Sequence, residues 1–209
     1  MDIGIIGSGH IGSTTARLFA AAGHEVVIAN SRGPESLRDL VAQLGARVRA
    51  GTVDEAARHG EVVLVAVPVK AAEDLPPDPF AGRIVVDANN YYPSRDGHFP
   101  QLDADETTST EMLAAHLPGA RVVKAFNTMN YRVLGEAGRA DAPHDERLAI
   151  YVAGDDAEAK AVVGGLIDEL GFAPVDTGGL AGGGRRQQPG TPVYAADLTG
   201  AAARERLGA

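Results

Sequence analysis

The chain has 209 residues, of which 19 are lysine or arginine and 28 are aspartate or glutamate, giving a formal net charge of −9 at pH 7. This length corresponds to one domain with some surplus, and the absence of cysteine excludes disulfides, thiolate zinc sites and a cysteine nucleophile. The acidic balance argues against nucleic acid as a partner, no apolar stretch is long enough for a membrane helix, and the first residues do not resemble a signal peptide. We therefore expect a cytoplasmic protein that binds neither nucleic acid nor membranes.

Short apolar strands alternate with alanine-rich helices over the first two thirds of the chain. The predicted strands are Ile3–Ile6, Glu25–Ala29, Arg47–Ala50, Glu61–Val67, Arg83–Asp87 and Arg121–Phe126. The predicted helices are Ile11–Ala22, Glu35–Leu44, Asp54–His59 and a helix to His116 that a capping box opens at Thr108–Glu111. Continuous apolar runs are typical of parallel strands that are covered on both faces. The alternation predicts an α/β fold with a doubly wound, mostly parallel sheet.

The last third continues the alternation with a strand at Arg147–Ala153, a helix at Ala157–Leu170 and a strand at Phe172–Asp176. The segment Gly178–Gly190 is rich in glycine and proline, which predicts a loop. A terminal helix is predicted at Ala195–Leu207. No composition shift divides the chain, so we expect a single domain.

A glycine motif lies between the first strand and the first helix. The run Gly7-Ser8-Gly9-His10-Ile11-Gly12 has the form G-x-G-x-x-G at the start of a βαβ unit, which is the context in which it binds dinucleotides. Gly7 permits a tight turn, Gly9 permits close approach of the pyrophosphate, and Gly12 permits close packing of helix and strand. The alternative is a glycine-rich turn without a ligand. The motif predicts a Rossmann dinucleotide-binding domain over residues 1–177, with residues 178–209 as a loop and helix extension of the same domain.

The residues after the second predicted strand bear on which dinucleotide is bound. An NAD site usually has Asp or Glu at this point, but here the chain reads Asn30-Ser31-Arg32. An acid would repel a 2′-phosphate, whereas Arg32 would attract one and Ser31 can donate a hydrogen bond to it. The alternative is that Asn30 and Ser31 are turn residues and Arg32 is a solvated charge. We interpret the turn as selective for NADP over NAD.

Three further strand ends are candidates for the rest of the pocket. Val67-Pro68-Val69 ends the most apolar strand and could pack against a nicotinamide ring, or it could simply terminate the strand. Asparagines follow the next two strands, at Asn89, Asn90 and Asn127, and they could hold a carboxamide or the edge of a heterocycle. The alternative is that these asparagines cap helices and form turns.

Acid–base and metal chemistry lack candidates in the sequence. The six histidines show no metal-ligand spacing, and no Ser/His/Asp order stands out. We therefore predict no metal site and assign no catalytic residue. A carbonyl reductase needs a proton donor, whereas hydride transfer between two bound heterocycles mainly needs the rings to be positioned face to face.

These motifs together resemble the coenzyme F420-dependent NADP oxidoreductases and their bacterial homologues. The resemblance rests on Gly7–Gly12, Ala29–Arg32, Ala66–Val69, Asp87–Asn90 and Lys124–Asn127, and it covers nearly the whole chain. It implies a compact Rossmann domain, NADP in the glycine-loop crevice, a deazaflavin stacked on the nicotinamide, and a homodimer. By position, it implies that NADP is held by Ser8, His10, Ile11, Ser31 and Arg32, that Val67, Pro68 and Asn89 lie near the nicotinamide, and that Asn127 and Met129 face the second substrate.

The second substrate implied by the resemblance, F420, carries a phosphate and a glutamate tail. A protein with a net charge of −9 would need a local basic patch to bind that tail. Arg185 and Arg186 in the glycine-rich segment are the candidates, and the alternative is that they belong to a solvated loop.

The sequence is compatible with three functions. The first is hydride transfer between NADPH and a second small redox heterocycle, either deazaflavin coenzyme F420 or a flavin. The second is NADPH-dependent reduction of a small imine or carbonyl metabolite. The third, of another class, is a non-catalytic NADP-sensing module.

Overall fold

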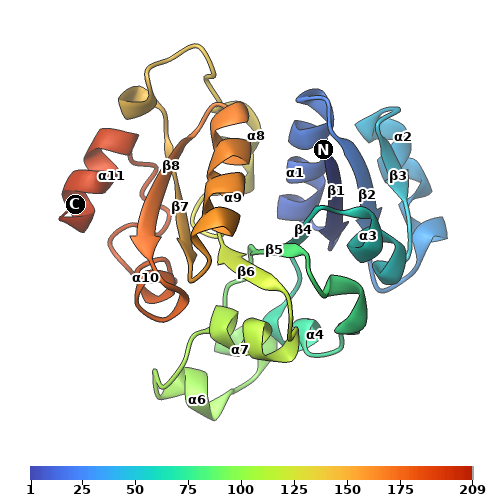
Figure 1. The fold of residues 1–209 in the computed structure, drawn as a ribbon, viewed down its shortest axis with the longest axis horizontal. Coiled ribbons are helices and arrows are strands. Elements are labelled where there is room, and N and C mark those ends of the chain that lie inside the picture. Colours follow the sequence, from blue (N-terminus) through green and yellow to red (C-terminus); the bar gives the residue numbers. More distant parts are fainter. Residues whose placement is uncertain (209) are drawn as a thin grey trace.

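The computed structural model describes residues 1–208, which form one eight-stranded sheet (Figure 1). Its strand order is β3-β2-β1-β4-β5-β6-β7-β8, and every neighbouring pair is parallel except β6 and β7. The strands are β1 Asp2–Ile6, β2 Glu25–Ala29, β3 Val48–Ala50, β4 Val62–Val65, β5 Ile84–Asp87, β6 Arg121–Lys124, β7 Ala149–Gly154 and β8 Ala173–Gly178. The predicted α/β fold with a mostly parallel, doubly wound sheet is confirmed.

Helices cover both faces of the sheet. One face carries α1 His10–Ala21, α2 Arg38–Leu44, α8 Tyr131–Glu136 and α9 Ala157–Glu169. The other face carries α3 Val53–His59, α4 Val69–Ala72, α7 Ser109–His116 and α10 Leu180–Arg186, with α11 Gly200–Leu207 beyond β8. Short turns complete the chain: α5 Pro93–Asp96, α6 Pro100–Asp103, and the 3-10 helices η1 Pro34–Leu37, η2 Asp78–Phe80 and η3 His144–Glu146.

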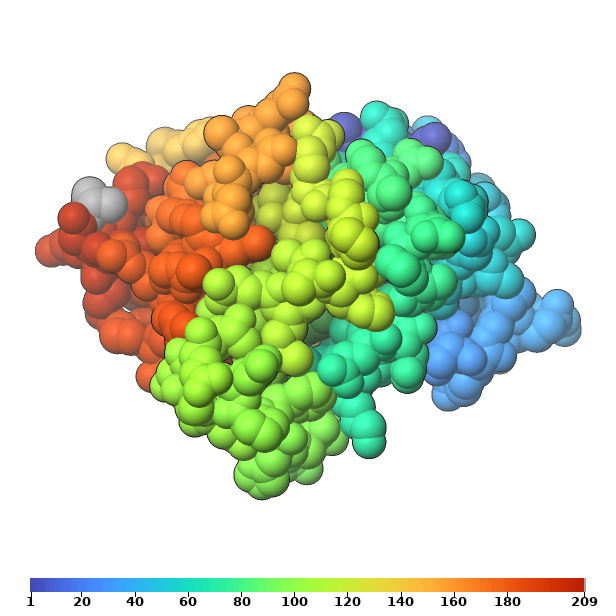
Figure 2. Space-filling model, turned by 60° about the horizontal axis from the view of Figure 1, so that its bottom comes forward, coloured from blue at the N-terminus to red at the C-terminus, as the bar shows by residue number. Residues whose placement is uncertain are grey.

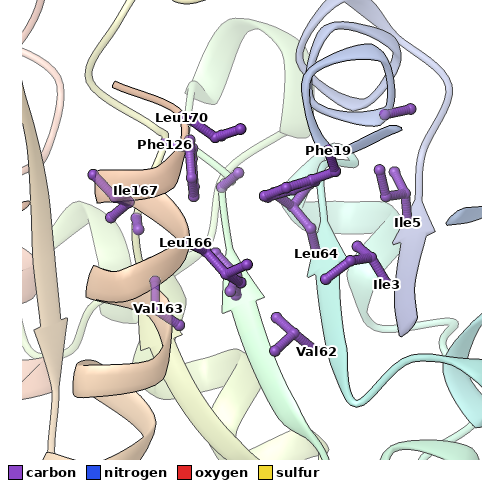
Figure 3. Close-up of a cluster of buried hydrophobic side chains, with 14 of the residues drawn as sticks. Ile3, Ile5, Phe19, Val62, Leu64, Phe126, Val163, Leu166, Ile167 and Leu170 are labelled. Carbon is purple, nitrogen blue, oxygen red and sulfur yellow. The ribbon is translucent and has the colours of Figure 1, made fainter. Parts of the chain in front are cut away.

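The hydrophobic core is split by the sheet into two layers, because successive strand residues point to opposite faces. Ile5 packs with Phe19 of α1, whereas the next residue, Ile6, packs with the cluster under α3. Figure 3 shows Val163 and Leu166 of α9 pointing toward the same face of the sheet as the side chains of β1 and β4. Burial on both faces explains why strands such as β4 Val62–Val65 have continuous apolar runs rather than an apolar residue at every second position.

The predicted loop at Gly178–Gly190 is wrong. β8 extends to Gly178, and Leu180–Arg186 form helix α10. A Cβ on Gly183 would lie 2.7 Å from the Thr177 carbonyl oxygen, so the glycines allow α10 to pack directly on the strand before it. Tertiary packing therefore overrides the low helix propensity of glycine.

Several predicted boundaries also differ from the structure. β6 ends at Lys124 rather than at Phe126, because Phe126 adopts a left-handed φ of +65° that ends the strand. The terminal helix begins at Gly200, after an N-cap at Thr199, and not at Ala195. The helix predicted over Glu35–Leu44 divides into η1 and α2. Within residues 1–208, every helix is too short or too polar to cross a bilayer.

Candidate functional site

The register of the parallel strands places the functional segments at one edge of the sheet. Ile6 pairs with both Ala29 and Val65, and Val65 pairs in turn with Asp87. Asp87 then pairs with Lys124. The segments that follow β1, β2, β4, β5 and β6 therefore leave the sheet side by side, at the carboxyl ends where doubly wound folds bind ligands.

The glycine loop shows which glycines are needed for packing and which for a ligand. Gly7 has a left-handed φ of +112°, and a Cβ there would lie 2.2 Å from the Ala66 carbonyl oxygen. A Cβ on Gly12 would lie 1.9 Å from the Gly7 carbonyl oxygen. A Cβ on Gly9 would meet nothing within 4 Å. Gly7 and Gly12 are therefore required by the fold, whereas Gly9 faces open space.

The N-terminus of α1 is suited to an anion. Gly9 is its N-cap residue and makes no side-chain capping hydrogen bond, and no acid lies in the first turn. The first N–H groups of a helix need acceptors, and together with the helix dipole they favour a phosphate. This geometry fits the pyrophosphate of a dinucleotide.

A crevice of about 550 Å³ opens beside this loop. This volume lies in the range of small-molecule and cofactor sites. Among the predicted site residues, those lining the crevice are Gly7, Ser8, Gly9, Asn30, Ser31, Arg32, Val67 and Pro68. The other lining residues, which were not predicted as site residues, are Ile6, Val53, Ala66, Ala71, Asp74, Leu75 and Pro76. Ala66 belongs to the segment Ala66–Val69 that carries the family resemblance, whereas the others could have been indicated only by their place at or after the ends of β1, β3 and β4.

The turn after β2 is ordered by the Asn30 side chain. Its Nδ2 donates to Ser8 Oγ at 3.1 Å and to Ser36 Oγ at 3.0 Å, and its Oδ1 accepts from the Arg32 N–H at 2.9 Å. Ser31 and Arg32 are exposed, and Arg32 forms no ion pair with any group of residues 1–208. The crevice wall thus presents an unpaired guanidinium beside the glycine loop.

The turn after β4 contributes two of its three predicted residues. Val67 and Pro68 line the crevice, and the Val67 N–H donates to Asn89 Oδ1 at 2.8 Å. Val69 is buried at the start of α4 and lines a separate small cavity with Met112. The structure therefore does not place Val69 with the crevice residues, because α4 turns its side chain under the helix.

The asparagines that follow β5 and β6 are hydrogen bonded to each other. Asn90 Nδ2 donates to the Asn127 carbonyl at 2.8 Å, and Asn127 Nδ2 donates to Asn90 Oδ1 at 3.0 Å and to the Gln187 carbonyl at 2.8 Å. Asn127 is 5% exposed, and its Oδ1 has no partner among residues 1–208. Met129 packs in the main hydrophobic core. Asn127 and Met129 are thus both largely buried, and a role for them in facing the second substrate stays a prediction.

The predicted basic pair lies on α10. Arg185 is 3.8 Å from Asp105, and Arg186 is exposed. Asp105 lines a second cavity of about 120 Å³ together with Asn90, Tyr91, Leu102, Ser109, Lys124, Gln188 and Pro189. Figure 2 shows the light-green segment that contains α6 projecting from this face, beside the orange C-terminal part. This cavity is too small to enclose a tricyclic ring system.

Two predicted site residues at the start of α1 do not line the crevice. His10 stacks on Tyr131 of α8 with ring centroids 4.1 Å apart, and Ile11 is partly buried against the main hydrophobic core. The Tyr92 hydroxyl is hydrogen bonded to the Tyr194 hydroxyl. Burial, together with this bond, raises the pKa of Tyr194, so its phenol stays protonated at neutral pH.

Within residues 1–208, no three histidine or acidic side chains come together to hold a metal ion.

Comparison with known proteins identifies the family. The model of the family described as NADP oxidoreductase, coenzyme F420-dependent, matches residues 2–91. A hypothetical protein, SMa0349, from Sinorhizobium meliloti is 38% identical over 95% of both chains, with a TM-score of 0.82. A protein from Arthrobacter sp. FB24, provisionally assigned as an F420-dependent NADP reductase, is 30% identical over 86% of both chains, with a TM-score of 0.73. The chain belongs to the coenzyme F420-dependent NADP oxidoreductase family.

Other relatives match this NADP-dependent oxidoreductase over only part of their own length. Metalloreductase STEAP3 of Rattus norvegicus is 33% identical over 181 residues, which are 86% of this chain but 34% of the relative. The chain thus spans about a third of the length of the curated metalloreductases that it matches. An imine reductase from Myxococcus stipitatus, 19% identical over 87% of this chain and 56% of its own, has a TM-score of 0.62 and shares the fold.

Proposed function

We propose that the chain transfers a hydride between NADPH and the deazaflavin coenzyme F420, with a flavin as the other candidate heterocycle. Family membership supports the first pairing. The observation that carries the NADP half is the crevice itself, where the open face of Gly9 lies beside the unpaired Arg32 guanidinium. A dinucleotide with a 2′-phosphate fits both features.

The crevice residues can be assigned to different parts of NADPH by the strands that they follow. The halves of a dinucleotide lie on the two sides of the switch point between β1 and β4. We assign the pyrophosphate to the N–H groups of the loop Gly7–Gly12, and the 2′-phosphate to Ser31 and Arg32. The adenine would then pack near Val53 and Leu75, which both line the crevice.

The nicotinamide half would lie toward β4 and β5, against Val67 and Pro68 and near Asn89. The second heterocycle would stack beyond it, over the Asn90 end of the site. The small size of the second cavity supports an arrangement in which this partner is held at an open surface rather than enclosed. Arg185 and Arg186, in the last turn of α10, remain the basic groups proposed for the acidic tail of F420.

The chemistry is a two-electron exchange. NADPH supplies a hydride to a ring carbon of the deazaflavin, and a proton from solvent balances the reduced ring. The residues of this chain bind and orient the two rings, which is the main requirement for hydride transfer between bound heterocycles.

A panel of electron acceptors tests the proposal. NADPH oxidation would be followed separately with F420, a free flavin, a simple cyclic imine and a ferric chelate. We expect turnover with F420, or with the flavin if that is the true partner. Turnover with the imine or the ferric chelate alone would overturn the proposal, and tight NADPH binding without turnover on any acceptor would favour an NADP sensor.

We further propose that the chain is a homodimer and that residues 178–209 fold as part of a single domain. The family resemblance supports the dimer, and the packing of α10 on β7 and β8 supports the single domain. Light scattering should give twice the chain mass of 21.6 kDa, and unfolding should show one transition. A mass of one chain, or two separate unfolding transitions, would contradict these statements.

A further inference from the structure

A buried polar cluster lies at the carboxyl ends of β5 and β6, next to the turn that carries Asn89. Asp87 at the end of β5 and Lys124 at the end of β6 are paired in register, and their exposed fractions are 0% and 1%. Lys124 Nζ lies 3.4 Å from Asp87 Oδ2 and donates to Thr110 Oγ1 of α7 at 2.9 Å. The Thr110 hydroxyl in turn donates to Asp87 Oδ2. Three elements are thus joined by charged and polar groups in the interior.

The same cluster fixes the backbone of Asn89 from both sides. Lys124 Nζ donates to the Asn89 carbonyl oxygen at 2.9 Å, and the Asn89 N–H donates to Asp87 Oδ1 at 3.0 Å. The Asn89 side-chain oxygen accepts from the Val67 N–H in the crevice wall. The side-chain Nδ2 has no acceptor within residues 1–208, although Asn89 is only 5% exposed. The amide NH₂ is therefore the one polar group of Asn89 that the fold leaves for a ligand.

A buried ion pair is costly to desolvate and is weak evidence for stability, since well-packed apolar residues often serve as well. The pair instead fixes the position of a turn, because Asp87 and Lys124 each form a hydrogen bond with the backbone of Asn89. We infer that Lys124 is a positioning residue, which holds Asn89 so that its NH₂ donates to an acceptor oxygen on the nicotinamide half of NADPH. This inference rests on the proposed function for the side of the crevice that the nicotinamide occupies.

The unpaired NH₂ of Asn89 indicates which kind of ligand atom it would bind. An amide NH₂ donates hydrogen bonds, so its partner is a carbonyl or hydroxyl oxygen, such as the carboxamide oxygen or a ribose hydroxyl. The adenosine half of NADPH lies across the switch point and does not reach Asn89. Loss of the positioning contact should therefore weaken binding of NADPH but not of adenosine 2′,5′-bisphosphate, which lacks the nicotinamide half.

The test uses the double variant Asp87→Asn with Lys124→Met. It removes both charges together, so no unpaired charge remains in the interior, and it retains an acceptor for the Asn89 N–H. We expect the Kd for NADPH to rise roughly three- to tenfold, the range for loss of one such hydrogen bond. The Kd for adenosine 2′,5′-bisphosphate should stay unchanged, and the fluorescence of bound NADPH should move toward that of free NADPH.

Two further variants separate positioning from folding. Thr110→Val should weaken NADPH binding in the same sense, and Thr110→Ser, which keeps the hydroxyl, should restore it. Lys160→Met, which removes a lysine paired with Asp176 on the far side of the sheet, is the matched control and should change neither affinity. Equal loss of both affinities, or no loss of either, in the double variant and in Thr110→Val would overturn the inference. Failure of the unmodified protein to bind NADPH would instead refute the proposed function, and this inference with it.

Discussion

At the residue scale, two glycines of one motif have different roles. Gly9→Val places a side chain where the structure has open space, so the fold should lose about 1 kcal/mol or less, the usual size of an N-cap change. The same side chain would fill the space that we assign to the pyrophosphate, so we expect the Kd for NADPH to rise at least about a hundredfold, because several bonds to charged groups would be lost. Titration calorimetry and urea unfolding measure the two effects.

Gly12→Val is the matched comparison, since its Cβ would lie 1.9 Å from the Gly7 carbonyl. It should unfold or strongly destabilise the protein. Unchanged NADPH binding by Gly9→Val would show that the pyrophosphate lies elsewhere.

We propose that Arg32 discriminates between NADPH and NADH. Arg32→Ala removes an exposed, unpaired guanidinium and should raise the KM for NADPH about tenfold to a hundredfold, the range for a hydrogen bond between charged groups. The KM for NADH should hardly change. Arg47→Ala, which breaks an exposed pair with Glu25 at the other end of β2, should affect neither. Equal effects of Arg32→Ala on both cofactors would refute a contact with the 2′-phosphate.

The sequence located the strand-end residues well, but it could not orient their side chains. Gly7, Arg32 and Pro68 line the crevice because the motif and the strand ends fix their place in the chain. Val69 and Met129 are buried instead, since helix rotation and core packing decide which way an apolar side chain points. That information arises only from tertiary contacts.

At the element scale, α10 shows how packing can impose a helix on a sequence that favours a loop. Gly182 lies on the exposed side of α10, and a Cβ there would meet nothing within 4 Å. Gly182→Ala should therefore stabilise the protein by about 0.5–1 kcal/mol, the difference in helix propensity between the two residues. Urea unfolding measures this change, and Gly183→Ala, which has no room for a Cβ, should do the opposite. Destabilisation by Gly182→Ala would contradict the helix.

The turn that carries α5 depends on a buried carboxylate, Asp96. Burial raises its pKa, but hydrogen bonds from the Arg95 guanidinium and the Tyr92 N–H outweigh it, so the pKa is lowered overall. A lowered native pKa stabilises the fold above the ordinary carboxyl range, and this stability is lost as the pH falls through the lowered value.

The variant Asp96→Asn should therefore be less stable than the parent protein at neutral pH, with the difference shrinking below about pH 4, where the unfolded carboxyl is protonated. Urea midpoints measured across this range test the expectation. A stability difference that is constant from neutral to acidic pH would show that the charge of Asp96 plays no part.

At the scale of the whole molecule, the doubly wound sheet could be predicted because its signal is repeated along the chain. Most strands are largely apolar, and β1 to β6 are parallel, so the segments that follow them leave the sheet at the same edge. The single antiparallel pair, β6 with β7, could not be predicted, since strand direction leaves no trace in composition. The crevice lining from the segment after α4, at Leu75 and Pro76, could not be predicted either, because it depends on how the chain after Val67 packs.

The central claim is direct hydride exchange between NADPH and F420 across this crevice. The most direct measurement is anaerobic reaction of F420, in ordinary water, with NADPH that carries deuterium at both positions of its reactive carbon. We predict loss of NADPH and F420 in equal amounts, with deuterium retained in the reduced deazaflavin. Reduced F420 without deuterium, or no oxidation of NADPH by F420, would contradict the account.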